Sequence, residues 1–134
     1  MANNRINPDS MYNSLAYGFS HAAVQTSGKT VHLAGQVAWD KDCNIVGGDD
    51  LAAQTRQTLA NIKTVIEAAG GTIADIVRLR IYVVNHSPDK LGVVLPEVGA
   101  FFGDVTPPPN TFLGVQALAL PDFLIEIEAT AAID

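Results

Sequence analysis

At the middle of the chain stands Val77-Arg78-Leu79-Arg80-Ile81-Tyr82-Val83, a stretch in which apolar and polar side chains alternate strictly. Successive side chains of a β-strand point to opposite faces, so this alternation predicts a half-buried strand. The core-facing residues are Val77, Leu79, Ile81 and Val83. Arg78 and Arg80 then share the other face, where they are either a displaced anion clamp or a pair of solvent- or interface-facing charges.

Two amphipathic helices are predicted to flank this strand. Before it, residues 51–69 carry apolar side chains at steps of three and four, the spacing of one buried helical stripe. This stripe is Leu51, Thr55, Leu59, Ile62, Ile66 and Ala69. Asp49 or Asp50 is expected to cap this helix, and Gly70-Gly71 to end it. After the strand, Ser87-Pro88 is a typical helix start. The stripe that follows is Leu91, Val94, Leu95, Val98, Phe101 and Phe102.

Four further stretches are predicted to be strands. Residues 21–24 and 30–37, with a turn at 26–29 between them, precede the first helix, and residues 39–50 form a polar connection that favours a small hairpin. Residues 111–118 and 123–132, joined by a turn at 121–122, follow the second helix. The order β-β-α-β-α-β-β indicates an α+β protein with two helices on one face of a mixed sheet.

The length of 134 residues fits a single domain over 1–134, with residues 1–13 as an irregular N-terminal arm. Hydrophobic residues make up 48% and the mean hydropathy is +0.19. A chain this short cannot hide so much apolar surface alone, so we expect another subunit to cover the free face of the sheet. The same apolar content leaves a chaperone-like, protein-binding role as a minor option.

The charge balance excludes the usual nucleic-acid binders. The net charge is −6, and Lys and Arg together number only 8. Phosphate neutralisation needs several cations on one face, and no basic cluster is present in the sequence. No stretch is long and apolar enough to span a membrane, and the polar residues 1–13 do not resemble a signal peptide. We therefore expect a cytoplasmic protein, in keeping with its lone Cys43.

Several segments of the chain resemble the motifs of one known family. Phe19-Ser20-His21-Ala22 is similar to that family's Tyr-Ser-Gln-Ala, and Ala34-Gly35-Gln36 to its Ser-Gly-Gln. Residues 54–70 resemble its first helix, residues 100–102 the end of its second helix, and residues 124–129 its C-terminal signature. By the shared order and spacing of these segments across nearly the whole chain, it is identified as a member of the RidA family, also called YjgF or endoribonuclease L-PSP.

The resemblance implies a chorismate-mutase-like α+β fold, with a mixed sheet of about six strands and two helices packed on one face. It also implies a homotrimer with three pockets between subunits. Enzymes of the family hydrolyse 2-imino and 2-amino-enoic acids and release ammonia without a cofactor. An arginine at the start of the penultimate strand holds the substrate carboxylate in those enzymes.

Four positions depart from the family's pattern in one direction. The arginine's place is held by Asn110, which keeps a hydrogen-bond donor but carries no charge. The family's tyrosine is Phe19, its serine is Ala34, and Leu95 stands about where active members often have asparagine. These changes predict a pocket for a less charged ligand, or one that has lost catalysis. Tyr17 precedes Phe19 by two residues and is expected to replace part of the missing tyrosine.

Glu126 is the predicted catalytic residue, because it occupies the place of the family's water-positioning glutamate. In a partly apolar pocket its carboxyl would act as a general acid or base. Thr111, the carbonyl of Phe112 and His21 complete the expected site, although a hydrogen-bonded structural role for His21 is the stronger alternative. No metal-ligand spacing and no cofactor motif is found. The favoured function is a cofactor-free hydrolase of an imine or enamine that either has no free α-carboxylate or has a differently placed anionic group. The alternative is a non-catalytic trimer that binds a small metabolite.

Overall fold

A computed structural model describes residues 3–26 and 28–134 of the chain. In chain order the strands and α-helices are β1 (Asn3–Ile6), β2 (Ala22–Gln25), β3 (Lys29–His32), α1 (Leu51–Ala68), β4 (Ile76–Val84), α2 (Leu91–Phe102), β5 (Asn110–Val115) and β6 (Ile125–Ile133). Short 3-10 helices lie at Ser14–Tyr17, Ile73–Asp75 and Pro88–Lys90. Every strand and helix predicted from the pattern is therefore present in some form, and β1 is added.

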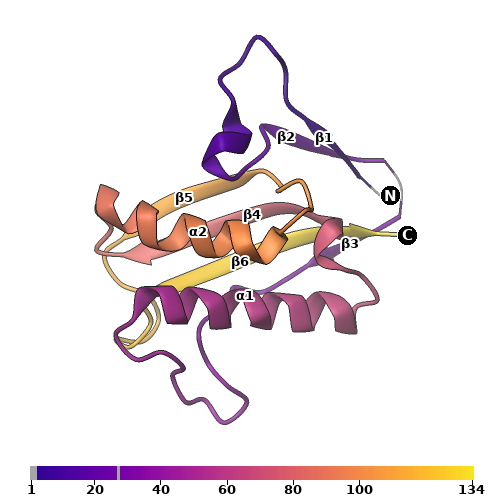
Figure 1. Cartoon of the computed structure of the whole chain (residues 1–134). Helices are drawn as coiled ribbons and strands as arrows, with labels where there is room; N and C mark the ends of the chain where they lie inside the picture. Colours follow the sequence, from indigo (N-terminus) through magenta and orange to yellow (C-terminus); the bar gives the residue numbers. More distant parts are fainter. Residues whose placement is uncertain (1–2, 27) are drawn as a thin grey trace.

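The main sheet has four strands in the order β3-β6-β4-β5, with α1 and α2 side by side on one face (Figure 1). The β4–β5 pair is parallel, whereas β6 runs antiparallel to both β3 and β4. This mixed sheet with helices on one face confirms the predicted α+β fold. Strands β1 and β2 form a separate antiparallel pair. The six strands are thus divided between two sheets.

The core lies between the helices and one face of the main sheet. Alternate residues of β4 and β6 point into it, and Ile81 and Ile127, which are paired in register, are fully buried. The helices contribute the predicted stripe residues Leu59, Ile62, Ile66, Val94, Val98 and Phe102. The opposite, helix-free face carries the other side chains of β4 and β6. We call it the helix-free face below.

The side chain of Asp50 caps the N-terminus of helix α1 by accepting a hydrogen bond from the Ala53 amide. The sequence left Asp49 and Asp50 as equal candidates. Gln54, which the stripe did not include, is fully buried. Its side-chain amide donates to the carbonyls of Gly48 (2.7 Å) and Asp122 (2.9 Å) and accepts from the Leu124 amide (3.0 Å), so it ties α1 to both neighbouring segments.

The prediction of an irregular arm over residues 1–13 was wrong for its first part. Residues Asn3–Ile6 form β1, which pairs with β2. Arg5 holds this strand in place by donating to the carbonyls of Thr106 (3.2 Å) and Ala74 (3.5 Å). The strand has little hydrophobic pattern because main-chain pairing and one arginine hold it, so periodicity could not find it.

The strands predicted at residues 21–24 and 30–37, with a turn at 26–29 between them, lie in two different sheets. Strand β2 pairs with β1 and β3 pairs with β6, so the two neighbours in sequence are not partners. The turn predicted at residues 26–29 includes Ser27, which lies outside the described residues. Regular pairing of β3 stops at His32 and returns only as a single bridge between Gln36 and Ile127, so the predicted strand 30–37 is interrupted.

Two smaller differences concern β4 and α2. The β4–β6 register is irregular between Ile76 and Arg78, and Ile76 rather than the predicted Val77 is fully buried. A bulge of this kind shifts side chains to the other face of a strand. The second helix begins at Leu91 rather than at Pro88, because residues 88–90 form a 3-10 turn. The helices of the described chain include none long and apolar enough to cross a membrane.

Candidate functional site

Asn110 and Glu126 lie on opposite faces of the main sheet. Asn110 pairs with Leu79, a core residue, so it faces the helices. Glu126 pairs with Tyr82, which is three positions farther along β4. Because neighbouring side chains of a strand alternate, an odd separation places the two on opposite faces. One small molecule cannot contact both side chains within a single chain.

The Asn110 hollow is the first of two candidate sites. It measures about 300 Å³ and is lined by Tyr12, Tyr17, Phe19, Leu91, Leu95, Asn110 and Phe112. It therefore brings together five of the predicted site residues. Asn110 is the only lining residue without an apolar or aromatic body, and its side-chain amide makes no hydrogen bond to any described residue. The amide is thus free to donate to a ligand and to accept from it.

The aromatic wall of this hollow comes from the N-terminal segment, which is fastened to the proline-rich linker. The fully buried Ser20 donates from its hydroxyl to the carbonyl of Pro107 (2.7 Å), and its amide donates to the carbonyl of Pro108. Asn7 donates to the Ser20 hydroxyl (3.2 Å) and accepts from the hydroxyl of the buried Ser14 (3.1 Å). These bonds hold the segment over β5 and α2. Tyr17 is the last residue of the 3-10 helix Ser14–Tyr17 in this segment.

His21 lies behind this wall rather than in it. Its Nε2 atom is 2.9 Å from the carbonyl oxygen of Tyr12, and its ring centroid is 4.7 Å from that of Tyr12. Its side chain borders a different hollow, near Pro109 and Thr130. The contacts agree with the structural alternative, in which His21 holds Tyr12 in place.

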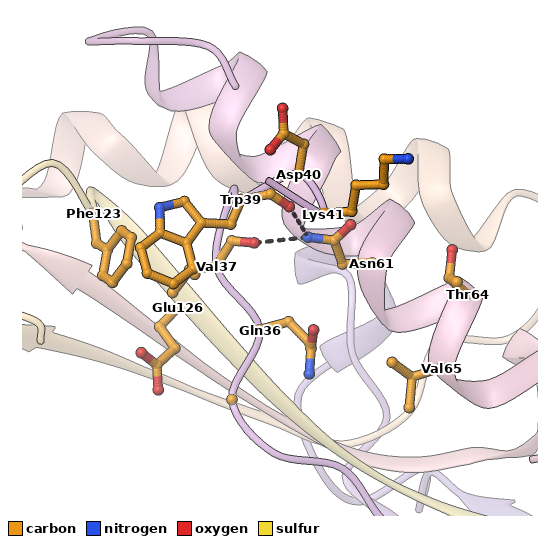
Figure 2. A pocket seen from close by; sticks show the side chains of 11 residues that line it. Gln36, Val37, Trp39, Asp40, Lys41, Asn61, Thr64, Val65, Phe123 and Glu126 are labelled. Carbon is orange, nitrogen blue, oxygen red and sulfur yellow. Dashed lines mark hydrogen bonds between the residues drawn. The ribbon is translucent and has the colours of Figure 1, made fainter. Parts of the chain in front are cut away.

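The Glu126 hollow is the second candidate site (Figure 2). It measures about 550 Å³ and lies between the segment 35–41 and the outer side of α1. Trp39 and Phe123 form an aromatic wall, with their rings 5.0 Å apart and nearly perpendicular. Figure 2 shows Asn61 donating to the carbonyls of Val37 (2.8 Å) and Trp39 (2.9 Å), which attaches the segment to α1. Lys41 and Asp40 lie at the rim.

The carboxylate of Glu126 occupies space that only a glycine at position 35 leaves open. A Cβ atom on Gly35 would lie 2.2 Å from Glu126 Oε2. Burial raises the pKa of the Glu126 carboxyl, and the nearby negative charge of Glu128 raises that pKa further. A carboxyl with a raised pKa holds a proton at a higher pH than usual, which suits a group that gives and takes protons.

The remaining predicted residues lie outside both hollows. Ala34 is exposed beside Gly35, and its carbonyl accepts a hydrogen bond from Gln36 (3.1 Å). Thr111 pairs with Arg80 and so points to the helix-free face, away from the Asn110 hollow. Arg80 lies 3.6 Å from Glu128 in a polar depression that it shares with Arg78. Neither arginine is therefore on the face that carries Asn110.

Residues 11–133 match the family model described as endoribonuclease L-PSP. The chain belongs to the endoribonuclease L-PSP family. A RutC family protein of Pyrococcus horikoshii is 35% identical to it over 107 residues, which is 78% of this chain and 80% of that protein.

Solved structures extend the endoribonuclease L-PSP likeness to the whole chain. A protein of unknown function of the conserved Rid family, YyfB from Yersinia pestis, is 57% identical with a TM-score of 0.96, and the match covers 99% of this chain and 100% of that one. The YjgF gene product of E. coli is 32% identical with a TM-score of 0.70, over 80% and 83% of the two chains. These likenesses agree with the fold and with the RidA resemblance of the sequence.

The sequence of this L-PSP family chain did not point to four of the residues that line the two hollows. Tyr12 and Leu91 line the Asn110 hollow, and Trp39 and Asn61 line the Glu126 hollow. Tyr12 lies in a stretch expected to be irregular, so no periodicity marked its direction. Leu91 was assigned to the core stripe of α2. In the described parts of the chain, no group of three or more His, Cys, Asp or Glu residues is placed to hold a metal ion.

Proposed function

We propose that this protein is a cytoplasmic, cofactor-free hydrolase of imines or enamines that lack the usual α-carboxylate. The observation that carries the proposal is the contrast between the two hollows. The Asn110 hollow has no charged lining residue, whereas the Glu126 hollow keeps a carboxyl with a raised pKa. A neutral binding wall together with an acid–base group suits a substrate that must be protonated and hydrated but has no carboxylate to be held.

The active form is proposed to be the homotrimer that the family resemblance implies. Asn110 and Glu126 lie on opposite faces of one sheet, so a shared site requires the Asn110 hollow of one copy to meet the Glu126 hollow of another. The rim of the Asn110 hollow supports such a contact. Tyr12 and Tyr17 are 58% and 61% exposed, and Met11 and Leu15 beside them are 50% and 43% exposed. Exposed apolar clusters of this kind mark interaction surfaces.

The proposed reaction consumes one water and releases ammonia. Water adds to the C=N carbon of the protonated imine, and the carboxylate of Glu126 takes the proton that the water loses. The protonated carboxyl then gives that proton to the nitrogen of the resulting carbinolamine. The C–N bond breaks while the carboxylate takes the proton of the carbinolamine hydroxyl, so the oxygen that came from water becomes the carbonyl oxygen of the product, and ammonia leaves with that proton as NH₄⁺. General acid–base catalysis of this type contributes about 10²- to 10⁴-fold to a rate.

A non-catalytic metabolite-binding trimer is the second candidate. Its support is the neutral Asn110 in the arginine's place, because loss of one charge-assisted pair weakens carboxylate binding by about 2–5 kcal/mol. TdcF from E. coli, which has a TM-score of 0.70 to this chain, was solved with bound serine. The nuclease activity in the family's name forms no part of the proposal, because 8 Lys and Arg residues stand against 14 Asp and Glu.

The test is the hydrolysis of imines generated in the assay by an oxidase. An amine oxidase supplies imines without a carboxylate, and an amino-acid oxidase supplies 2-imino acids. We expect the protein to accelerate ammonia release from the first group, and Glu126→Gln to lower that acceleration at least about 100-fold. Glu67→Gln is the matched control, because Glu67 is an exposed glutamate of α1 that does not line the hollow. No acceleration with any imine would refute the hydrolase and leave the binding protein.

A further inference from the structure

The Asn110 hollow has the side-chain composition of a site for an organic cation. Four of its seven lining residues are aromatic: Tyr12, Tyr17, Phe19 and Phe112. The face of an aromatic ring carries partial negative charge and attracts a cation placed within about 6 Å of its centre. No lysine, arginine or histidine lines the hollow. A cation in it would therefore meet attraction from the rings without opposing charge from the wall.

The rings of the N-terminal segment form walls rather than a stack. Tyr12 and Tyr17 have their centroids 6.2 Å apart at an angle of 72°, and Tyr12 and Phe19 lie 6.4 Å apart at 67°. These are edge-to-face contacts between neighbouring rings, so the three side chains present differently oriented surfaces to the hollow that they line. Phe112, on β5, lines the same hollow from the sheet. A compact cation in the hollow would be bordered by all four rings.

Three basic side chains stand near the hollow without lining it. The His21 ring lies 4.7 Å from the Tyr12 ring, and the His86 ring lies 4.9 Å from the Phe112 ring, each behind the wall. Lys90 precedes the lining residue Leu91, but its ammonium donates to the carbonyls of Val84 (3.1 Å) and Asn85 (2.9 Å) and is held there. Position 110 carries an amide where the family has a permanent positive charge. The whole chain has a net charge of −6. In the proposed trimer the carboxyl of Glu126 from another copy faces this hollow as well.

We infer that the Asn110 hollow binds a compact organic cation without a carboxylate, namely the protonated imine of the proposed reaction. That the cation is a protonated imine rests on the proposed function. That the ligand is positively charged rests only on the aromatic lining of the hollow. A protonated imine, R₂C=NH₂⁺, reacts with water to give the carbonyl compound R₂C=O and NH₄⁺. Atoms and charge balance without any further reactant. Asn110 accepts a hydrogen bond from the N–H of the cation.

An isosteric pair of probes isolates the charge. Choline and 3,3-dimethylbutan-1-ol have the same shape and differ in the positive nitrogen. Binding of each to the full-length protein is measured by NMR titration and by calorimetry. We expect choline to bind about 2- to 30-fold more tightly, the range that cation–π contact provides. Glycine betaine, in which a carboxylate replaces the hydroxymethyl group of choline, is expected to bind more weakly than choline.

Variants locate the effect at the rings. Tyr12→Leu is expected to remove most of the preference for choline while leaving binding of the neutral alcohol nearly unchanged. Tyr12→Phe is the matched control, since it keeps the ring and loses only the hydroxyl. Phe112→Leu tests the opposite wall, and a thermal unfolding curve for each variant shows whether it is folded.

Equal binding of the two probes, or tighter binding of the alcohol, would overturn the inference and make the hollow a site for neutral ligands. A choline preference that survives in both leucine variants would also overturn it, because the charge would then be recognised elsewhere. The proposed function fails separately. Carboxylate-free imines could be hydrolysed without any charge preference, and choline could bind tightly to a protein that hydrolyses nothing.

Discussion

Gly35→Ala tests whether the position of the Glu126 carboxylate matters. The added Cβ atom would lie 2.2 Å from Oε2, 2.8 Å from Cδ and 3.1 Å from Cγ of Glu126. Real Cβ atoms do not approach other heavy atoms closer than 3.0 Å, so Oε2 must withdraw by about 0.8 Å or more. Displacement of a catalytic group by about 1 Å costs up to about 100-fold in rate. We expect a loss of roughly 10- to 100-fold in ammonia release.

The fold should survive this substitution. The displaced atoms are the end of a flexible side chain, so the free energy of unfolding should fall by at most about 1.5 kcal/mol. The pKa of Glu126, followed by NMR of its carboxyl carbon, should fall toward its ordinary value as the carboxylate moves into water. Gly99→Ala is the matched control. It lies in α2 with no heavy atom within 4 Å of its added Cβ, and it should raise stability by about 0.5–1 kcal/mol.

Two outcomes would contradict this reasoning. Full activity in Gly35→Ala, with the titration of Glu126 unchanged, would show that the Glu126 carboxylate does not need the space beside Gly35. Loss of activity together with a large fall in Tm would instead assign the effect to folding. Only a folded, weakly active variant with a lower Glu126 pKa supports a positioning role for Gly35.

Three further predictions concern Gln54, Tyr82 and Asn110. Gln54→Leu keeps the volume of a fully buried side chain but leaves two backbone carbonyls and one backbone amide without hydrogen-bond partners. The free energy of unfolding should therefore fall by about 3 kcal/mol, and the Tm measured by circular dichroism should fall with it. The hydrogen bond that Tyr82 donates to Glu128 raises the pKa of Tyr82 above 10.0. The stability that this hydrogen bond gives the fold is present below pH 10.0 and is lost as the pH rises through the raised pKa of Tyr82. An ultraviolet titration of the Glu128→Gln variant should show Tyr82 ionising at a lower pH than in the unchanged protein. Asn110→Arg should increase hydrolysis of 2-imino acids at least about tenfold in the oxidase-coupled assay, and no increase would show that position 110 does not hold the substrate.

The stretches with strong local periodicity were predictable because their pattern is set by neighbours in the chain. The stripe of α1 and the alternation of β4 each have one apolar face, and burial of that face determines the element. The places of Asn110 and Glu126 came from the resemblance to the family. That resemblance could assign positions, but it could not assign the direction in which each side chain points.

Other elements depend on partners that are distant in sequence. Strand β1 pairs with β2 and is held by Arg5 on carbonyls near residues 74 and 106, and none of these contacts leaves a local pattern. The bulge that buries Ile76 in place of Val77 arises in the register with β6. Tyr12 enters the Asn110 hollow because Ser20 and Asn7 fasten the N-terminal segment to the proline linker.

The sequence by itself determined the two helices, the central strand, the family, and the neutral residue at position 110. Only the tertiary structure decided that Asn110 and Glu126 face opposite sides of the sheet, and that the hollow around Asn110 is walled by aromatic rings. The physical reason is that a side chain's direction in a sheet depends on the register of each strand against its neighbours. That register is set by packing across the whole domain rather than by adjacent residues.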